Sequence, residues 1–121
     1  MAKKKKDALV AAVIDGIQDI KGKGITVMDL REVDSSVCDY FVICEGNSST
    51  HVSSLADSIE DKVREEVGEK PYHIEGRQNA QWVLMDYYNV VVHIFQKEAR
   101  AFYSLETLWD DAKSEQIPDL D

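Results

Sequence analysis

The apolar residues at the start of the chain recur at steps of three and four positions. This spacing places them on one side of a helix, which is expected to end near Gly22 and Gly24. A second amphipathic stripe begins after Ser48 or Ser49, either of which would cap the helix, and it stops before Gly68. The first stripe consists of Leu9, Val10, Val13, Ile14, Ile17 and Ile20, and the second of Val52, Leu55, Ala56, Ile59, Val63 and Val67.

Short apolar runs between and after these helices indicate β-strands. Ile25–Leu30 predicts a short strand and Tyr40–Cys44 is a continuous apolar run, and both suit interior positions of a sheet. The alternation of helices with strands predicts a single α/β domain whose mixed sheet is flanked by helices. Further strands are expected at Tyr72–Glu75, Gln81–Tyr87 and Val90–Phe95, the last two as an antiparallel hairpin.

The two ends of the chain differ from the part between them. Four lysines, Lys3 to Lys6, form a basic tail at residues 1–6. Residues 113–121 are assigned to an acidic C-terminal tail, which is expected to be frayed at Pro118 and the acidic end at Asp121. The domain proper is predicted to cover residues 7–112 and to end in a third helix after Glu98. The apolar residues that recur at helical spacing in that helix are Phe102, Leu105, Trp109 and Ala112.

The charge of the chain limits its partners. Its 121 residues suit one domain, and 23 acidic against 14 basic side chains give a formal net charge of -9. Phosphate backbones attract clustered Lys and Arg, so direct sequence-specific binding to nucleic acid is not expected. A basic protein partner is favoured, and the alternative is that the acidic charge only keeps the protein soluble.

The sequence also favours a cytoplasmic location. Cys38 and Cys44 flank an extended run, which would hold them about 20 Å apart, too far for a disulfide. The basic start resembles a signal peptide only briefly, because Asp7 interrupts it and no cleavage site follows. No run approaches the roughly 20 apolar residues of a membrane span.

The turn from Gly46 to Thr50 is a candidate ligand-binding site. A strand, a glycine turn and a helix start would expose backbone N–H groups to an anion, although the turn matches no P-loop or dinucleotide motif. A nucleotidyltransferase would place metal-binding carboxylates after such a turn. The next acidic residues, Asp57, Glu60 and Asp61, are expected to be the solvated face of the second helix, so no metal or cofactor is predicted.

The histidines are expected to be structural. His51 falls in the first turn of a helix, and His93 lies in an apolar strand, where a hydrogen bond beneath a helix would satisfy it. Ser48, His51 and Asp39 would form a triad only if the fold brought them together. No catalytic residue is therefore predicted.

The strand around Trp82 carries the clearest sign of a binding surface. Alternation sends Trp82, Leu84 and Asp86 to one face and Val83, Met85 and Tyr87 to the other. Tryptophan is favoured at the centre of protein interfaces, and Asp86 beside it would suit a basic partner. The alternative is that Trp82 is covered by a helix of its own domain.

Four ordered blocks of the sequence resemble the ribosomal silencing factor (Iojap) family. The first, Asp39–Val52, resembles the family's Asp-Tyr-Phe-Val-Ile and Gly-x-Ser-x-x-His-Val pattern, and the last, Arg100–Trp109, is similar to its closing helix. Between them, Glu75-Gly76 and Trp82–Asp86 followed by Val90–Phe95 resemble its central block. The match departs at Tyr88-Asn89, where the family has Gly-Asp, which affects the expected shape of the turn.

This resemblance implies a function. The family binds the large ribosomal subunit through ribosomal protein uL14, blocks association with the small subunit and so represses translation; organelle relatives are linked to large-subunit biogenesis. It implies a fold similar to nucleotidyltransferases without an active site, and an association with dimerisation. The implied partner-binding residues are Trp82, Leu84 and Asp86, with Tyr87 and Tyr88 as neighbours. The competing hypotheses are a nucleotide-binding or nucleotidyltransferase-like enzyme and a general assembly scaffold.

Overall fold

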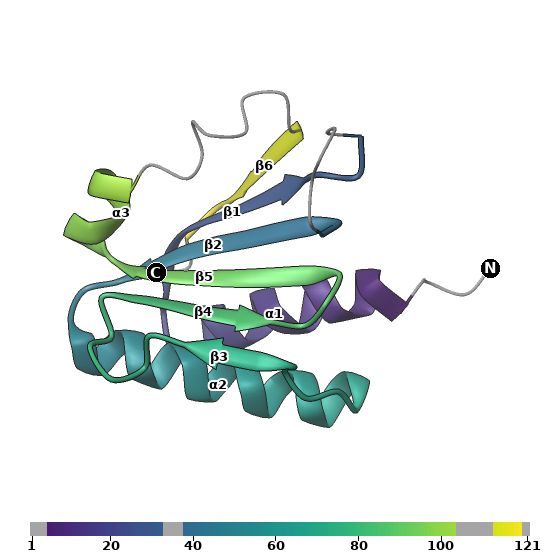
Figure 1. Ribbon diagram of the computed structural model, residues 1–121, viewed down its shortest axis with the longest axis horizontal. Coiled ribbons are helices and arrows are strands. Elements are labelled where there is room, and N and C mark those ends of the chain that lie inside the picture. Colours follow the sequence, from purple (N-terminus) through teal and green to yellow (C-terminus); the bar gives the residue numbers. More distant parts are fainter. Residues whose placement is uncertain (1–4, 33–37, 104–112, 120–121) are drawn as a thin grey trace.

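Three helices and six strands make up the described part of the chain, residues 5–32, 38–103 and 113–119 of this computed structural model (Figure 1). Their order confirms the predicted alternation of helices and strands. The elements are α1 (Lys5–Asp19), β1 (Lys23–Asp29), β2 (Tyr40–Gly46), α2 (Ser49–Val67), β3 (His73–Glu75), β4 (Trp82–Asp86), β5 (Val90–Gln96), α3 (Lys97–Tyr103) and β6 (Lys113–Ile117).

The six described strands form one mixed sheet in the order β3-β4-β5-β2-β1-β6. Strands β2 and β5 pair in parallel, whereas every other neighbouring pair is antiparallel. The predicted hairpin is β4–β5, in which Trp82 lies opposite Phe95 and Asp86 opposite Val91. Strands β1 and β2 are interior strands, as their apolar sequences predict.

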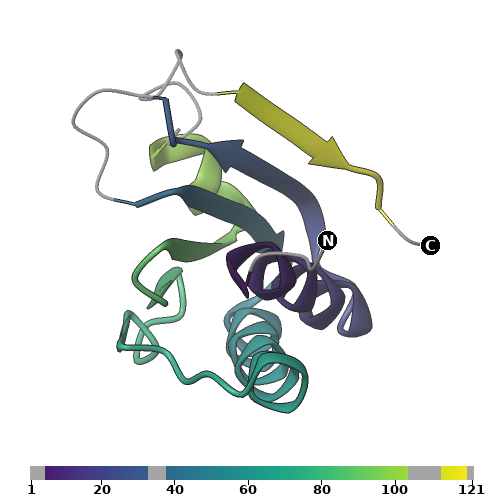
Figure 2. The same cartoon turned by 90° about the vertical axis from the view of Figure 1, so that its right-hand side faces the viewer.

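The helices divide between the two faces of the sheet. Helices α1 and α2 lie side by side on one face, and α3 lies on the other (Figure 2). The α1–α2 face holds the larger core, which includes Val42, Val92 and Ile94 from the central strands. A second apolar cluster on the α3 face consists of Met28, Leu30, Cys38, Phe41, Ile43, Val91 and Phe95, with Trp82, Leu84 and Ala99 packed against it.

Helix α2 begins and ends where the sequence predicts. The hydroxyl of Ser48 accepts the backbone N–H of His51 at 3.0 Å, which satisfies one of the free donors of the first turn. Gly68 follows the last turn with φ 75°, and its N–H donates to the carbonyls of Val63 and Arg64. Both caps confirm the boundaries drawn from sequence.

Helices α1 and α2 approach closely at Gly16. A Cβ atom at Gly16 would lie 2.8 Å from Cα of Ile59, and the Ser58 hydroxyl donates to the Gly16 carbonyl at 2.7 Å. The Gly16→Ala variant is therefore expected to lose about 2 kcal/mol of unfolding free energy, because the helix backbones must separate. Urea unfolding measures this loss.

Helix propensity alone makes the opposite prediction for the same variant. An alanine in a helix interior is favoured over glycine by about 1 kcal/mol, so a more stable Gly16→Ala protein would contradict the close packing. Gly68→Ala is the control, since a Cβ there meets no atom within 4 Å and only the left-handed backbone is affected.

Residues 113–117, which lie in the predicted acidic C-terminal tail, form strand β6. Lys113–Ile117 pairs antiparallel with β1, with Asp29 opposite Lys113 and Ile25 opposite Ile117. Four of its five residues are exposed, so backbone hydrogen bonds define this strand and apolar alternation does not. The predicted third helix is confirmed from Lys97 to Tyr103, whereas its residues 104–112 lie outside the described residues.

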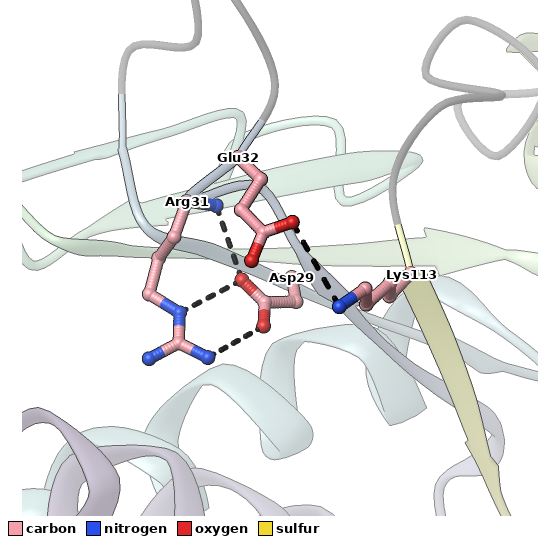
Figure 3. A network of polar contacts seen from close by, with 4 residues as sticks. All are labelled: Asp29, Arg31, Glu32 and Lys113. Carbon is pink, nitrogen blue, oxygen red and sulfur yellow. Dashed lines mark hydrogen bonds and ion pairs between the residues drawn. The ribbon is translucent and has the colours of Figure 1, made fainter.

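Polar contacts join the ends of β1 and β6 (Figure 3). The Arg31 guanidinium donates from Nε and Nη2 to the two carboxylate oxygens of Asp29 at 2.9 and 2.7 Å. These hydrogen bonds hold the pKa of the Asp29 carboxyl below its usual range. Nζ of Lys113 lies 3.8 Å from Oε1 of Glu32, an exposed pair that contributes little to stability.

Both cysteines lie inside the domain. Cys38 and Cys44 are free and buried, and burial raises the pKa of the Cys38 thiol to about 11 and of the Cys44 thiol to about 12. Both thiols therefore stay protonated near neutral pH. No helix in the described ranges is long and apolar enough to cross a membrane.

Candidate partner-binding site

Strand β4 confirms the predicted alternation of its side chains. Trp82, Leu84 and Asp86 are half-buried on one face, whereas Val83 and Met85 are fully buried against the α1–α2 layer. Strand β3 pairs only with residues 84–86 of β4 and stops short of Trp82. By burial, the face that carries Trp82 is the less completely covered face of this strand.

The Trp82 indole contacts two side chains of the neighbouring strand β5. Its ring stacks on Phe95 with 5.0 Å between centroids and 25° between planes. Its Nε1–H donates a hydrogen bond of 3.0 Å to Nδ1 of His93. The indole thus rests on its own domain by one surface and keeps part of its area accessible.

His93 is buried on the same face as Trp82. It is 4% exposed, and the Phe41 ring meets it in a T-shaped contact at 4.6 Å. Burial lowers the pKa of His93 from 6.5 to about 4, so the imidazole is neutral near pH 7. Its predicted hydrogen bond is present at Nδ1, whereas Nε2 has no partner among the described residues.

The loop before β4 fits closely against Trp82. Gly76 has φ 87°, a region that favours glycine, and a Cβ there would lie 2.1 Å from the Trp82 carbonyl oxygen. The Gly76 carbonyl accepts the Ala80 N–H at 2.9 Å, which closes the loop. Gly76 therefore helps to set where β4 begins, a role that the sequence analysis did not assign to it.

Two exposed tyrosines lie together at the other end of β4. Tyr72 and Tyr88 are 65% and 66% exposed, with 4.6 Å between ring centroids. Tyr88 has φ 73°, and its N–H donates to Oδ1 of Asp86 at 2.8 Å, so a tyrosine adopts the conformation that usually needs glycine. Sequence reasoning missed Tyr72, because only β3–β4 pairing brings it beside the hairpin turn.

Tyr87 is not part of this surface. Its side chain is 3% exposed and belongs to the α1–α2 core, on the opposite face from Trp82. Burial also raises the pKa of its hydroxyl. The surface brought together by the structure consists of Trp82, Leu84, Asp86 and Tyr88, with Tyr72 added and Tyr87 removed from the residues predicted by sequence.

Hydrogen bonds within the protein engage several backbone N–H groups of the turn between β2 and α2. The Asn47 N–H donates to Nδ1 of His51 at 3.0 Å, and Nε2 of His51 lies 2.7 Å from the Ile20 carbonyl. The Ser48 hydroxyl accepts the N–H of His51, and the Ser48 carbonyl accepts the N–H of Val52. Three backbone donors that an anion at this turn could use, the N–H groups of Asn47, His51 and Val52, are therefore already bonded.

A pocket of about 490 Å³ adjoins this turn. Lys21, Lys23 and Lys97 line it together with Glu45. A second pocket of about 530 Å³ is lined by Glu45 as well and by Arg100. Arg100 donates to Glu45 at 3.2 Å, to the Gly24 carbonyl and to the Thr26 hydroxyl, so it ties α3 to the sheet.

The residues of the enzyme hypotheses are kept apart. Asp39 precedes β2, whereas Ser48 and His51 follow its far end, so a strand of seven residues separates them. On α2, Asp57 pairs with Arg77 and Asp61 pairs with Arg64, which confirms a solvated helix face. Within the described ranges, no group of three or more His, Cys, Asp or Glu side chains could hold a metal ion.

Comparison with known proteins agrees with the resemblance seen in the sequence. The family model described as "Ribosomal silencing factor during starvation" matches residues 3–121. The ribosomal silencing factor RsfS of Bacillus subtilis is 41% identical over 113 residues, which cover 93% of this chain and 89% of that protein. RsfS of Halalkalibacterium halodurans is 36% identical over 109 residues, which cover 90% and 92%.

A solved structure supports the fold. The crystal structure of a protein from Chromobacterium violaceum superposes with a TM-score of 0.82 at 30% sequence identity. The match covers 89% of this chain and 88% of that one, so it includes most of the sheet and helices described above.

Proposed function

Since the chain belongs to the ribosomal silencing factor family, we propose that it represses translation by binding the large ribosomal subunit through protein uL14. Bound there, it blocks association with the small subunit by occupying the joining face. The family is non-enzymatic, which agrees with the prediction that this chain is not an enzyme.

The half-buried Trp82 is the observation that supports this proposal most. Its indole and the side chain of Leu84 lie on the less covered face of β4, with the carboxylate of Asp86 next along the strand. Aromatic residues anchor protein interfaces, and a carboxylate beside them favours a basic partner. The uL14 contact is accordingly assigned to Trp82, Leu84 and Asp86, with Tyr88 as a neighbour.

Further parts of the proposal follow from the family. The protein acts in the cytoplasm, aids large-subunit biogenesis, and has a fold of nucleotidyltransferase type without an active site. The bonded N–H groups of the β2–α2 turn and the ion-paired Asp57 and Asp61 support the last point. The family's association with dimerisation extends the proposal to a homodimer, which its mass in solution tests.

Co-sedimentation with purified large subunits tests the proposed function. The folded protein is expected to travel with large subunits and to remain in the supernatant with small subunits alone. Failure of the folded protein to bind large subunits would reject the proposal and would favour the competing hypothesis of an assembly scaffold with another partner.

Salt is expected to weaken this binding. A chain with net charge -9 that docks on a basic protein gains part of its association rate from long-range attraction. Raising the ionic strength from about 0.01 to 0.15 M shortens the Debye length from about 30 to 8 Å and is expected to slow association about tenfold. Stopped-flow or surface-binding kinetics measure it; an unchanged association rate would contradict electrostatic steering.

A further inference from the structure

The orientation of the Trp82 indole depends on two contacts with β5. Stacking on Phe95 sets the plane of the ring, and the hydrogen bond to His93 sets which edge points toward β5. The β4–β5 register places Trp82 opposite Phe95 and Leu84 opposite His93, so both supports come from one strand. Together they hold the indole in the orientation seen in the structure.

His93 is itself fixed before any partner arrives. The Phe41 ring packs edge-on against the imidazole with 4.6 Å between ring centroids, and the Phe95 ring centroid lies 6.4 Å from that of His93. His93 is only 4% exposed. An indole N–H can only donate, so Nδ1 of His93 carries no proton and acts as the acceptor. The proton of the neutral imidazole is then on Nε2.

Stability alone does not account for a histidine at this place. Its Nε2–H is buried without a partner among the described residues, and an unpaired buried donor destabilises the folded state. Every other residue of β5 from Val90 to Phe95 is apolar, and an apolar side chain at 93 would avoid this penalty. Histidine supplies Nδ1, which accepts the indole N–H of Trp82, and an apolar residue has no such acceptor.

We propose that His93 is a positioning residue of the partner-binding surface, whose Nδ1 holds the Trp82 indole in the orientation that contacts uL14. This inference rests on the proposed function. Preorganising an anchor side chain strengthens binding because the rotamer entropy has been lost before association. His93 need not touch the partner to have this effect.

Two substitutions separate the hydrogen bond from the bulk of the side chain. His93→Leu removes the acceptor and fills its place with an apolar side chain. His93→Asn instead places a carbonyl oxygen close to the position of Nδ1. Both are made in a Trp109→Phe background, which leaves Trp82 as the one tryptophan of the sequence. The readouts are hydrogen exchange of the indole N–H by nuclear magnetic resonance and affinity for large subunits.

The parent protein of this series, Trp109→Phe with His93 intact, is expected to show a slowly exchanging indole N–H and to bind large subunits. His93→Leu is expected to speed exchange and weaken binding about tenfold, and His93→Asn is expected to recover most of both. Equal exchange and affinity in the parent and the folded His93→Leu variant would overturn the inference. Absence of binding by the parent would instead reject the proposed function, while the exchange rates still decide whether His93 fixes the indole.

A variant with an intact His93 tests the hydrogen bond even if the His93 variants fail to fold. Trp82→Phe keeps an aromatic ring over Phe95 and removes only the N–H donor and the second ring of the indole. It is expected to bind at least tenfold more weakly than the parent. Full affinity in Trp82→Phe would show that the hydrogen bond is not needed and would overturn the inference.

Discussion

Replacement of Trp82 by alanine is expected to weaken binding to large subunits about 100-fold or more. The indole is half-buried on the less covered face of β4. Central aromatic anchors of this kind typically account for about 2 to 4 kcal/mol of binding. The truncation also leaves His93 without its hydrogen-bond donor. Titration of labelled protein with large subunits measures the change in dissociation constant.

The control for this variant lies on the other layer of the molecule. Glu65→Ala removes an exposed side chain of α2, on the helix layer that covers the opposite face of the sheet, and is expected to bind like the parent. Thermal melting first establishes that both variants are folded. If Trp82→Ala bound as tightly as Glu65→Ala, the partner-binding surface would have to lie elsewhere.

Acid is expected to destabilise the protein through His93. The pKa of this histidine is 6.5 ordinarily and about 4 in the folded protein, because burial disfavours the charged ring. Between these values the unfolded chain binds a proton that the folded chain does not, so stability falls as pH falls. The lowered pKa corresponds to about 3 kcal/mol, fully present above pH 6.5 and lost progressively toward pH 4.

The same variants isolate this effect. Urea unfolding between pH 7 and 4 is expected to show a steeper loss of stability for the parent than for His93→Leu, whose residue 93 cannot bind a proton. Comparison of slopes removes the contribution of the carboxylates, which both proteins share. Parallel slopes would show that His93 is not held neutral by the fold.

Sequence patterns predicted the elements that bury apolar side chains. The stripes of α1 and α2, the continuous run of β2 and the alternation in β4 all follow the periods of helix and strand, and each lies where expected. The caps at Ser48 and Gly68 were predictable because each has a local chemical reason.

The missed features depend on contacts between distant parts of the chain. Strand β6 is polar, so only its pairing with β1 reveals it. Tyr72 joins Tyr88 through the register of β3 and β4, and His93 receives Trp82 from a neighbouring strand. Tyr87 was grouped with the site by its position in sequence, although strand alternation turns it to the buried face.

A subunit-joining experiment shows whether the protein blocks association of the two ribosomal subunits. Large subunits are incubated with the protein before small subunits are added, and joined ribosomes are separated from free subunits on a sucrose gradient. We expect the joined peak to fall as the protein approaches the concentration of large subunits, and Trp82→Ala to leave the peak intact. A joined peak that stays unchanged while the folded protein is in excess would contradict the proposed silencing function.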